Sequence, residues 1–418
     1  MKVRGTVRVP GDKSISHRAL ICASLATGES RIRGLLLSDD VRSTATVLRQ
    51  LGAGIPELSD DVAITGEGLG RLVEPRMSLQ CGNSGTTTRL VAGVVAAHPF
   101  TSRFEGDGSL SRRPMQRIAE PLTAMGARFE FEHSDGLPMT VHGGQLSGIA
   151  WNTRSASAQT KSAILFAALV AGVPVSIRES AKSRDHTELM LASLGVPVTT
   201  GNQSISMSQV HELRAFDISI PADPSSAAYM VALATLATEG EVRLPGVCIN
   251  PTRIGFMNML QRMGGAVRFV GRHRGAGEDL ATVVAAPAAL RPAKARAGDV
   301  PSMIDELPLL GCVAAAAGAD LEVTGAGELR VKESDRIGAL VANLRAIGAD
   351  AEELRDGFRI RAGRRQFNGH VVTRGDHRIA MAFGILAALP DNRIDIDDRD
   401  CVSVSYPAFW EDVAALSD

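Results

Sequence analysis

The strongest constraint on the fold of this chain is that one helical pattern recurs along it. Five segments end alike, with apolar residues at helical spacing that stop at a glycine: Gly52, Gly126, Gly195, Gly264 and Gly348. Glycine is favoured just after a helix because it enters the left-handed backbone region without strain. The spacing is about one sixth of the chain, and we expect a sixth helix over 409–416. Such spacing predicts an architecture built by repetition of one unit.

A second set of six helical segments is apolar on most sides and rich in alanine. They cover 15–28, 84–97, 157–172, 224–240, 304–318 and 376–389. A helix without a polar face is buried, and small side chains let neighbouring helices approach closely. Strand-like runs follow several of the first set of helices, for example 127–132 and 357–362. The pattern therefore predicts an α/β protein with buried helices.

A larger repeat divides the 418 residues into two halves. An extended run leads into Pro-x-Asp and then into a buried helix at 7–12, and again at 218–223. The chain is too long for one ordinary core, so two domains are expected. Two homologous halves of three units each explain the repeat. A chance pair of common turns is the alternative.

Composition fits a soluble globular protein and excludes several classes. Hydrophobic residues make up 44%, the net charge is −1, and no long charged run occurs, which argues against general nucleic-acid or membrane-surface binding. The first residues, MKVRGTVRVPG, lack the apolar core of a secretory signal, and no apolar stretch is long enough to span a membrane. The five cysteines are widely spaced, as in reduced cytosolic proteins. We expect a cytoplasmic protein without a structural metal.

The polar residues of the buried helices gather at their amino-terminal ends. These helix starts carry Lys13, Ser14, Asn83, Ser84, Ser157, Gln159, Asp223, Ser225, Asp305, Asp376, His377 and Arg378. Capping explains Ser84, Asp223 and Ser225, since Ser and Asp are favoured caps. A cation near a helix start opposes the helix dipole, so Lys13, Arg18 and Arg378 indicate that an anion binds there.

Further basic residues fit the same interpretation. Arg89 follows GNSG, Arg112 and Arg113 precede a helix, and VKESDRIG contains Lys332, Glu333 and Arg336. A solvated face is the alternative for Arg112 and Arg113, and a helical ion pair is the alternative for the group of Lys332, Glu333 and Arg336. Together they favour an active site for a multiply anionic substrate. Asp305 and Glu333 are the acid–base candidates, and Asp305 could instead be a helix cap. The segments GEGLG and GDKS complete neither a dinucleotide nor a nucleotide phosphate loop.

Seven segments resemble the signature blocks of 5-enolpyruvylshikimate-3-phosphate (EPSP) synthases: GDKSISHRAL, GNSGTTTRL, SRRPM, SASAQTKSA, SRDHTELML, ESDRI and GDHRIAMAF. The similarity extends from about residue 3 to the end. It implies the enolpyruvyl transferase fold, an α/β fold of two similar domains, each with three β-α-β-α-β-β units around buried helices. The first strand would belong with the second half. We therefore expect one domain over 13–221 and another formed by 1–12 and 222–418, joined by two hinge crossings.

The resemblance also implies a reaction. EPSP synthases transfer the enolpyruvyl group of phosphoenolpyruvate to the 5-hydroxyl of shikimate 3-phosphate and release phosphate, by addition and elimination. The step belongs to the shikimate pathway of aromatic amino-acid biosynthesis, and glyphosate targets it. The family needs no metal or organic cofactor. The partners would be these two small molecules, with no nucleic acid and no membrane, and we expect a monomer.

Site residues follow from the matching blocks. Shikimate 3-phosphate would contact Lys13, Ser14, Arg18, Ser157, Gln159, Arg184, Asp305 and Lys332. Phosphoenolpyruvate would contact Lys13, Gly85, Arg113, Gln159, Arg336 and Arg378. Asp305 and Glu333 resemble the proton-transfer pair, and Lys13 completes the catalytic set. The chain has Ala158 where many members have a second serine, and Val404 where many have a lysine, so one contact to each substrate lacks its usual side chain.

Two other functions remain as alternatives. The related UDP-N-acetylglucosamine enolpyruvyl transferases share the repeats, but open with a Lys-Asn pair and use a loop cysteine. Here Lys13 is followed by Ser14, and residues 105–114 contain no cysteine. A non-catalytic anion-binding repeat protein would need the basic residues, but not Asp305 and Glu333 together.

Overall fold

The computed structural model of the chain describes residues 1–363 and 366–417. It divides into two compact units: an amino-terminal unit of 11–220 with 275–278, and a carboxy-terminal unit of 1–10, 221–274 and 279–418. The breaks after residues 10 and 220 lie near the predicted domain breaks after 12 and 221, which stay predictions. The grouping of residues 275–278 with the amino-terminal unit was not predicted from the sequence.

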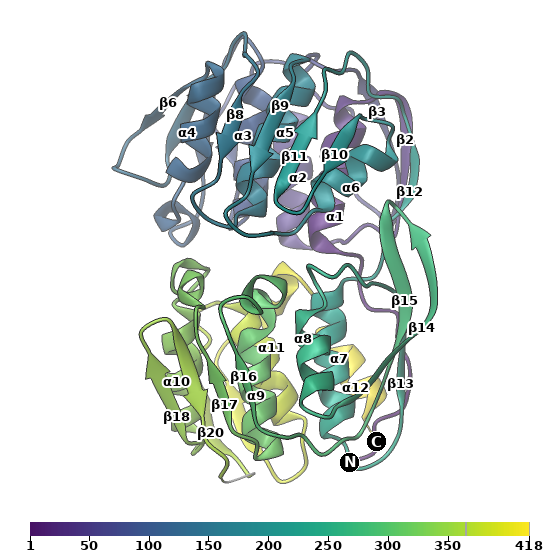
Figure 1. The fold of residues 1–418 in the computed structure, drawn as a ribbon, viewed down its shortest axis with the longest axis vertical. Coiled ribbons are helices and arrows are strands. Elements are labelled where there is room, and N and C mark those ends of the chain that lie inside the picture. Colours follow the sequence, from purple (N-terminus) through teal and green to yellow (C-terminus); the bar gives the residue numbers. More distant parts are fainter. Residues whose placement is uncertain (364–365, 418) are drawn as a thin grey trace. The chain divides into compact units, whose positions relative to one another are not determined.

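Helices and strands alternate in the amino-terminal unit (Figure 1). They are α1 (Lys13–Leu25), β2 (Thr27–Arg33), α2 (Asp39–Gln50), β3 (Asp61–Glu67), β4 (Leu79–Gln80), α3 (Gly85–Ala96), β5 (Thr101–Glu105), η1 (Leu110–Arg112), α4 (Gln116–Met125), β6 (Arg128–Phe131), β7 (Met139–His142), β8 (Ala150–Asn152), α5 (Ala158–Ala171), β9 (Val175–Arg178), α6 (His186–Ser193), β10 (Val198–Thr200), β11 (Ser204–Met207) and β12 (Asp217–Ser219). The strands form three sheets, ordered β12-β2-β3, β4-β5-β7-β6 and β10-β11-β9-β8.

The carboxy-terminal unit repeats this plan. Its elements are β1 (Gly5–Thr6), α7 (Pro224–Leu236), β13 (Val242–Cys248), α8 (Gly255–Arg262), β14 (Ala266–Gly275), β15 (Glu278–Ala286), β16 (Ala293–Ala295), η2 (Val300–Ser302), η3 (Ile304–Glu306), α9 (Leu307–Ala317), β17 (Leu321–Val323), η4 (Gly327–Val331), α10 (Arg336–Ala346), β18 (Ala351–Leu354), β19 (Gly357–Ile360), β20 (Asn368–Val371), α11 (His377–Ala387), β21 (Arg393–Ile396), η5 (Asp400–Val404) and α12 (Phe409–Leu416). Its sheets are ordered β1-β13-β15-β14, β16-β17-β19-β18 and β20-β21.

The fold is α/β with two similar units, as predicted, but the repeat is not complete everywhere. Four sheets follow β-α-β-α-β-β in element order. Within the described residues, the β2 sheet has a single strand after α2, and the last sheet has α12 in place of a final strand pair. The strand β1 pairs in parallel with β13, in the second half, as the resemblance implies. The β2 sheet instead receives β12, from the far end of its own unit.

Each unit has its own hydrophobic core, built around the predicted buried helices. Helices α1, α3 and α5 contribute to one core, and α7, α9 and α11, which pack against one another (Figure 1), to the other. All five predicted cap glycines have positive φ, from +84° to +124°, and α12 covers the predicted 409–416. In the described part of the chain, every helix is too short or too polar to cross a membrane.

The buried helices approach one another so closely that some positions have no room for a side chain. In α3, a Cβ on Gly93 would lie 2.3 Å from the carbonyl oxygen of Ala163 in α5 and 2.8 Å from its Cα. Both atoms belong to backbone, so neither can move aside without moving its helix. This contact fixes the separation of α3 and α5.

We predict that Gly93→Ala lowers the free energy of unfolding by about 1–3 kcal/mol, because the two helices must move apart. Alanine favours helix by about 1 kcal/mol over glycine, so a net loss would reflect the close contact alone. Gly144→Ala is the control, since its Cβ would meet nothing within 4 Å. Urea unfolding measures both variants. Equal stability of Gly93→Ala and the wild type would contradict the prediction.

Candidate active site

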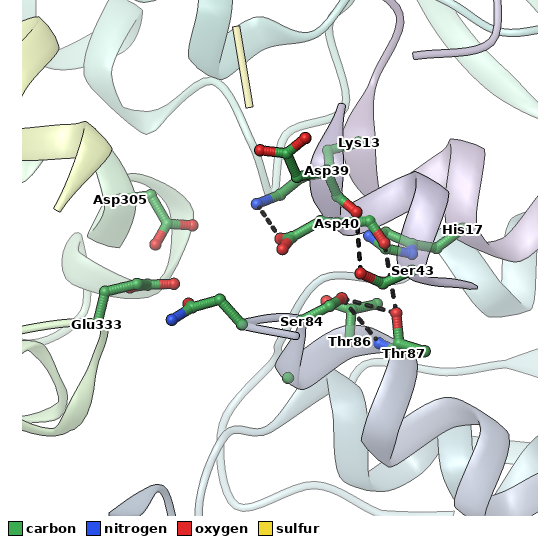
Figure 2. A network of polar contacts seen from close by, with 12 residues as sticks. Lys13, His17, Asp39, Asp40, Ser43, Ser84, Thr86, Thr87, Asp305 and Glu333 are labelled. Carbon is green, nitrogen blue, oxygen red and sulfur yellow. Dashed lines mark hydrogen bonds and ion pairs between the residues drawn. The ribbon is translucent and has the colours of Figure 1, made fainter. Parts of the chain in front are cut away.

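Lys13 is the first residue of α1, and it is not the residue that caps this helix. The buried side chain of Asp12 caps this helix, accepting a hydrogen bond of 2.9 Å from the backbone N–H of Ile15. The Lys13 ammonium lies 2.8 Å from Asp40 Oδ2 in the first turn of α2 (Figure 2). Asp40 could not be singled out from the sequence, because an acidic residue in a first helical turn is ordinary. Ser14 follows Lys13, and its carbonyl oxygen accepts from Arg18 at 2.8 Å.

Arg18 is a buried cation surrounded by neutral acceptors. Its Nε donates to Thr187 Oγ1 at 2.6 Å and its Nη2 to Ser162 Oγ at 2.9 Å. It forms no ion pair within the described residues, although burial leaves only 4% of it exposed. Burial lowers the pKa of Arg18 to about 10, so the side chain stays charged at neutral pH. A buried charge without a close counter-ion favours binding of an anion beside it.

The starts of α3 and α5 share one polar cluster. Arg89 donates to Gln159 Oε1 at 2.9 Å, and Gln159 donates to Thr86 Oγ1 at 3.1 Å. A Cβ on Gly85 would lie 2.6 Å from Arg89 Nη1 and 3.5 Å from Arg113 Nη1. The structure therefore brings three predicted phosphoenolpyruvate ligands together: Gly85, Arg113 and Gln159. Glycine at position 85 leaves the backbone of α3 open to a ligand.

The start of α5 and the loop before α6 carry the remaining predicted ligands of this unit. Ser157 caps α5 by accepting from the N–H of Thr160 at 3.3 Å, and Ala158 is its first residue. Arg184 lies in the loop after β9 and is partly buried.

A buried ion cluster holds the loop of Arg184. Lys161 in α5 lies 3.2 Å from Glu179 and 2.7 Å from Glu188. Glu179 also accepts from the backbone N–H of Ser183 at 3.1 Å. Burial raises the pKa of Glu188, against the attraction of Lys161. The cluster fixes the chain immediately before Arg184, a role for Lys161 that the sequence alone did not predict.

Arg336 is the centre of the cluster in the carboxy-terminal unit. It lies 2.9 Å from Asp376, 3.2 Å from Asp305 and 2.5 Å from Glu333, with 1% of its side chain exposed. Burial alone would lower the pKa of Arg336, but the three carboxylates outweigh it and hold the pKa above its ordinary value. The acid–base candidates Asp305 and Glu333, both labelled in Figure 2, are thus bound to one guanidinium.

Asp305 lies near a second cation and one residue before the N-cap position of α9. Lys332 lies 3.6 Å from Asp305 Oδ1. Asp305 belongs to η3, and the N-cap position of α9 is Glu306, whose side chain makes no capping hydrogen bond. Asp305 therefore does not occupy the N-cap position of the alanine-rich helix.

The other capping interpretations have a mixed outcome. Ser84 and Asp223 cap α3 and α7, as predicted. Ser225 does not cap α7, because its hydroxyl accepts from Arg253 at 3.0 Å while its N–H donates to Asp223. The role of Ser225 could not be predicted from its own segment, since its partner Arg253 lies 28 residues further along the chain.

Arg378 is buried in the first turn of α11. Its N–H donates to Asp376, the N-cap of that helix, at 2.9 Å. Burial opposes the charged form, but Tyr229, Asp305 and Glu306 outweigh it and keep the pKa of Arg378 above its ordinary value. Val404 is the last residue of η5 and is partly buried. Because its side chain is apolar, this position carries no charge. Over 1–363 and 366–417, no three His, Cys, Asp or Glu side chains gather as metal ligands.

Comparison with known proteins gives consistent results. A family model described as EPSP synthase (3-phosphoshikimate 1-carboxyvinyltransferase) matches residues 1–413. The 3-phosphoshikimate 1-carboxyvinyltransferase of Aquifex aeolicus is 44% identical over 418 residues, covering 99% of this chain and 97% of the relative. That of Bacillus velezensis is 39% identical over 417 residues, covering 99% and 97%.

Solved structures agree with the sequence relatives. The EPSP synthase of Acinetobacter baumannii has a TM-score of 0.86 at 36% identity, covering 100% of this chain and 96% of that one. The enolpyruvyl transferase NikO of Streptomyces tendae has a TM-score of 0.78 at 18% identity, covering 99% and 95%. The second similarity supports the fold alone.

We predict that Asp376→Ala lowers the free energy of unfolding by about 3–5 kcal/mol, because it removes the most buried partner of the Arg336 guanidinium. The carboxylate also accepts from the Ser334 hydroxyl at 2.8 Å and caps α11. Asp305→Ala is the control: it removes a partner of the same guanidinium, but one that is more exposed, and should cost less than Asp376→Ala because two carboxylates still neutralise Arg336. Urea unfolding compares them, and equal losses would show that Asp376 is not the main counter-ion.

Proposed function

This chain belongs to the EPSP synthase family, and we propose that the two clusters described above perform that family's reaction together. The enzyme transfers the enolpyruvyl group of phosphoenolpyruvate to shikimate 3-phosphate, in the shikimate pathway. The observation that carries the proposal is Arg18, a buried cation with only neutral acceptors, one turn beyond Lys13 and Ser14. This arrangement suits a substrate with several negative charges.

Shikimate 3-phosphate would be bound mainly by the amino-terminal unit. Its ligands there would be Lys13, Ser14, Arg18, Ser157, Gln159 and Arg184. The starts of α1 and α5 offer backbone N–H groups and a positive dipole end to the phosphate. Because Ala158 has no hydroxyl, one phosphate contact would come from such a backbone group. Asp305 and Lys332 of the carboxy-terminal unit would contact the reacting side of the ring.

Phosphoenolpyruvate would be bound by cations of both units: Lys13 and Arg113 from the first, Arg336 and Arg378 from the second. Gly85 and Gln159 would complete its site. Four cations offset the charge of a phosphate and a carboxylate and hold both beside the acceptor hydroxyl. We expect glyphosate, which carries a phosphonate and a carboxylate, to compete for these residues.

The chemistry then needs two proton transfers that are later reversed. Asp305 would take the proton of the 5-hydroxyl as its oxygen attacks C2 of phosphoenolpyruvate, while Glu333 would help to protonate C3. In the tetrahedral adduct that results, loss of a proton from C3 accompanies cleavage of the bond from C2 to the phosphate oxygen. Lys13 would stabilise the departing phosphate. Every step uses side chains alone, so we propose no metal and no organic cofactor.

Three further properties belong to the proposal: the oligomeric state, the location in the cell and the absence of macromolecular partners. We expect a monomer, since each unit has its own core. We expect a cytoplasmic enzyme, because its five cysteines are free thiols and four of them are buried. Nucleic acids and membranes would not be partners.

A phosphate-release assay tests the proposed function. The purified protein is incubated with phosphoenolpyruvate in two parallel reactions. One contains shikimate 3-phosphate as the acceptor, and the other contains UDP-N-acetylglucosamine. We expect phosphate release with shikimate 3-phosphate only. Release with the nucleotide sugar would favour the related transferase, and anion binding without any release would favour a non-catalytic protein.

We predict that Asp305→Asn lowers kcat by about 10²–10⁴-fold, because an amide cannot accept the hydroxyl proton. The affinity for shikimate 3-phosphate should change little, since the amide oxygen can still accept a hydrogen bond. Glu322→Gln is the matched control, a carboxylate in β17 that pairs with Arg359 on the same sheet. Steady-state kinetics and calorimetry give kcat and affinity. A kcat within a few-fold of wild type would exclude Asp305 as the base and leave Glu333.

A further inference from the structure

Four buried side chains form a continuous hydrogen-bonded chain beneath the predicted ligands of the amino-terminal unit. His17 Nδ1 lies 2.6 Å from Thr44 Oγ1, which lies 2.6 Å from Thr87 Oγ1. Thr87 Oγ1 donates to Ser84 Oγ at 2.7 Å. Each residue is at most 1% exposed. The chain, which we call the hydroxyl relay, joins α1, α2 and α3. Figure 2 labels three of its members, His17, Ser84 and Thr87.

The direction of these hydrogen bonds can be worked out from one end. Ser84 Oγ caps α3 by accepting from the N–H of Thr87 at 3.2 Å, and it also accepts from the Thr87 hydroxyl. Thr87 must then accept from Thr44, and Thr44 from His17, so the proton of the imidazole is on Nδ1. His17 Nε2 has no hydrogen-bond partner among the described residues. A proton on Nε2 would be a buried donor without an acceptor, which is costly.

The surroundings keep His17 neutral. Burial, with Lys13 and Arg18 adding to it, lowers the pKa of His17 well below its ordinary value. A neutral imidazole with its proton on Nδ1 is the form that the hydroxyl relay requires. The relay is therefore fixed in one direction at neutral pH.

The relay lies one helical turn behind the candidate site in two helices. His17 is four residues after Lys13 in α1, and Thr44 is four residues after Asp40 in α2, so each pair shares a helix face. Lys13 and Asp40 themselves form an ion pair at 2.8 Å. In α3, the relay ends on Ser84, whose neighbour Gly85 starts the helix, and Thr87 also lies 3.4 Å from the carbonyl oxygen of Asp40.

We propose that His17, Thr44 and Thr87 are positioning residues for phosphoenolpyruvate. They hold the start of α3, with Ser84 and Gly85, in register with the Lys13–Asp40 pair. The inference rests on the proposed function, in which Lys13 and Gly85 bind this substrate. Loss of one hydroxyl would let the helix start shift relative to Lys13, and such small displacements weaken binding strongly.

The test is a threonine series at position 44. Thr44→Val keeps the shape but removes both hydrogen bonds, and Thr44→Ser keeps the hydroxyl. The KM for phosphoenolpyruvate is measured at saturating shikimate 3-phosphate, beside kcat and Tm. We expect KM to rise about 3–10-fold in Thr44→Val, the equivalent of one buried hydrogen bond. KM in Thr44→Ser should stay within about twofold of wild type, which a packing defect would not explain.

A matched control separates positioning from stability. Thr235 in α7 is also buried, and its hydroxyl donates to the carbonyl oxygen of Val231 at 2.7 Å. Thr235→Val should lower Tm without raising KM for phosphoenolpyruvate. His17→Phe, which keeps an aromatic side chain but removes the Nδ1 donor, should reproduce the rise in KM and serves if Thr44→Val does not fold.

Several outcomes would overturn the inference. They are an unchanged KM in Thr44→Val or His17→Phe, a Thr44→Ser variant as impaired as Thr44→Val, and an equal rise in Thr235→Val. Each of these leaves the proposed function intact, because the wild type still turns over. Absence of phosphate release by the wild type would instead overturn the proposed function and this inference with it.

Discussion

A helix buried on all sides can present polar groups only at its ends, and the rest of this structure depends on that constraint. Helices α3 and α5 touch so closely at Gly93 and Ala163 that no side chain fits between them. Polar side chains therefore gather at the helix starts, where Asp12 and Asp376 accept hydrogen bonds from backbone N–H groups. Once capped, these starts keep a positive dipole end and room for cations, and both features favour an anionic ligand.

The two units differ in the partners of the buried arginine near their helix starts. In the amino-terminal unit, the buried Arg18 is bound only to neutral oxygens, so its charge is available to a ligand. In the carboxy-terminal unit, Arg336 is bound to three carboxylates. A ligand of Arg336 must compete with Asp305 and Glu333, and could free them as it binds. In the proposed reaction, this difference suits the amino-terminal unit for holding the acceptor and the carboxy-terminal unit for proton transfer.

Much of the fold could be predicted because its signals are local. A glycine that ends a helix, such as Gly126, can be predicted from its own segment because only the φ of that glycine is involved. A buried helix can likewise be predicted from the composition of its own residues. Contacts between distant segments could not be predicted in the same way. Asp376 reads as an ordinary cap, yet it also binds Arg336, 40 residues away. The relay from His17 to Thr87 depends on the packing of three helices, which no local pattern encodes. The site blocks were recognised through family resemblance and not from spacing.

We propose that residues of both units bind one molecule of shikimate 3-phosphate. Amide hydrogen exchange with and without this ligand tests it most directly, because the readout is local and needs no turnover. We predict slower exchange at 13–18 and 157–161 in the amino-terminal unit, and also at 304–307 and 332–336 in the carboxy-terminal unit. Slower exchange confined to the amino-terminal unit at saturating ligand would contradict binding by both units.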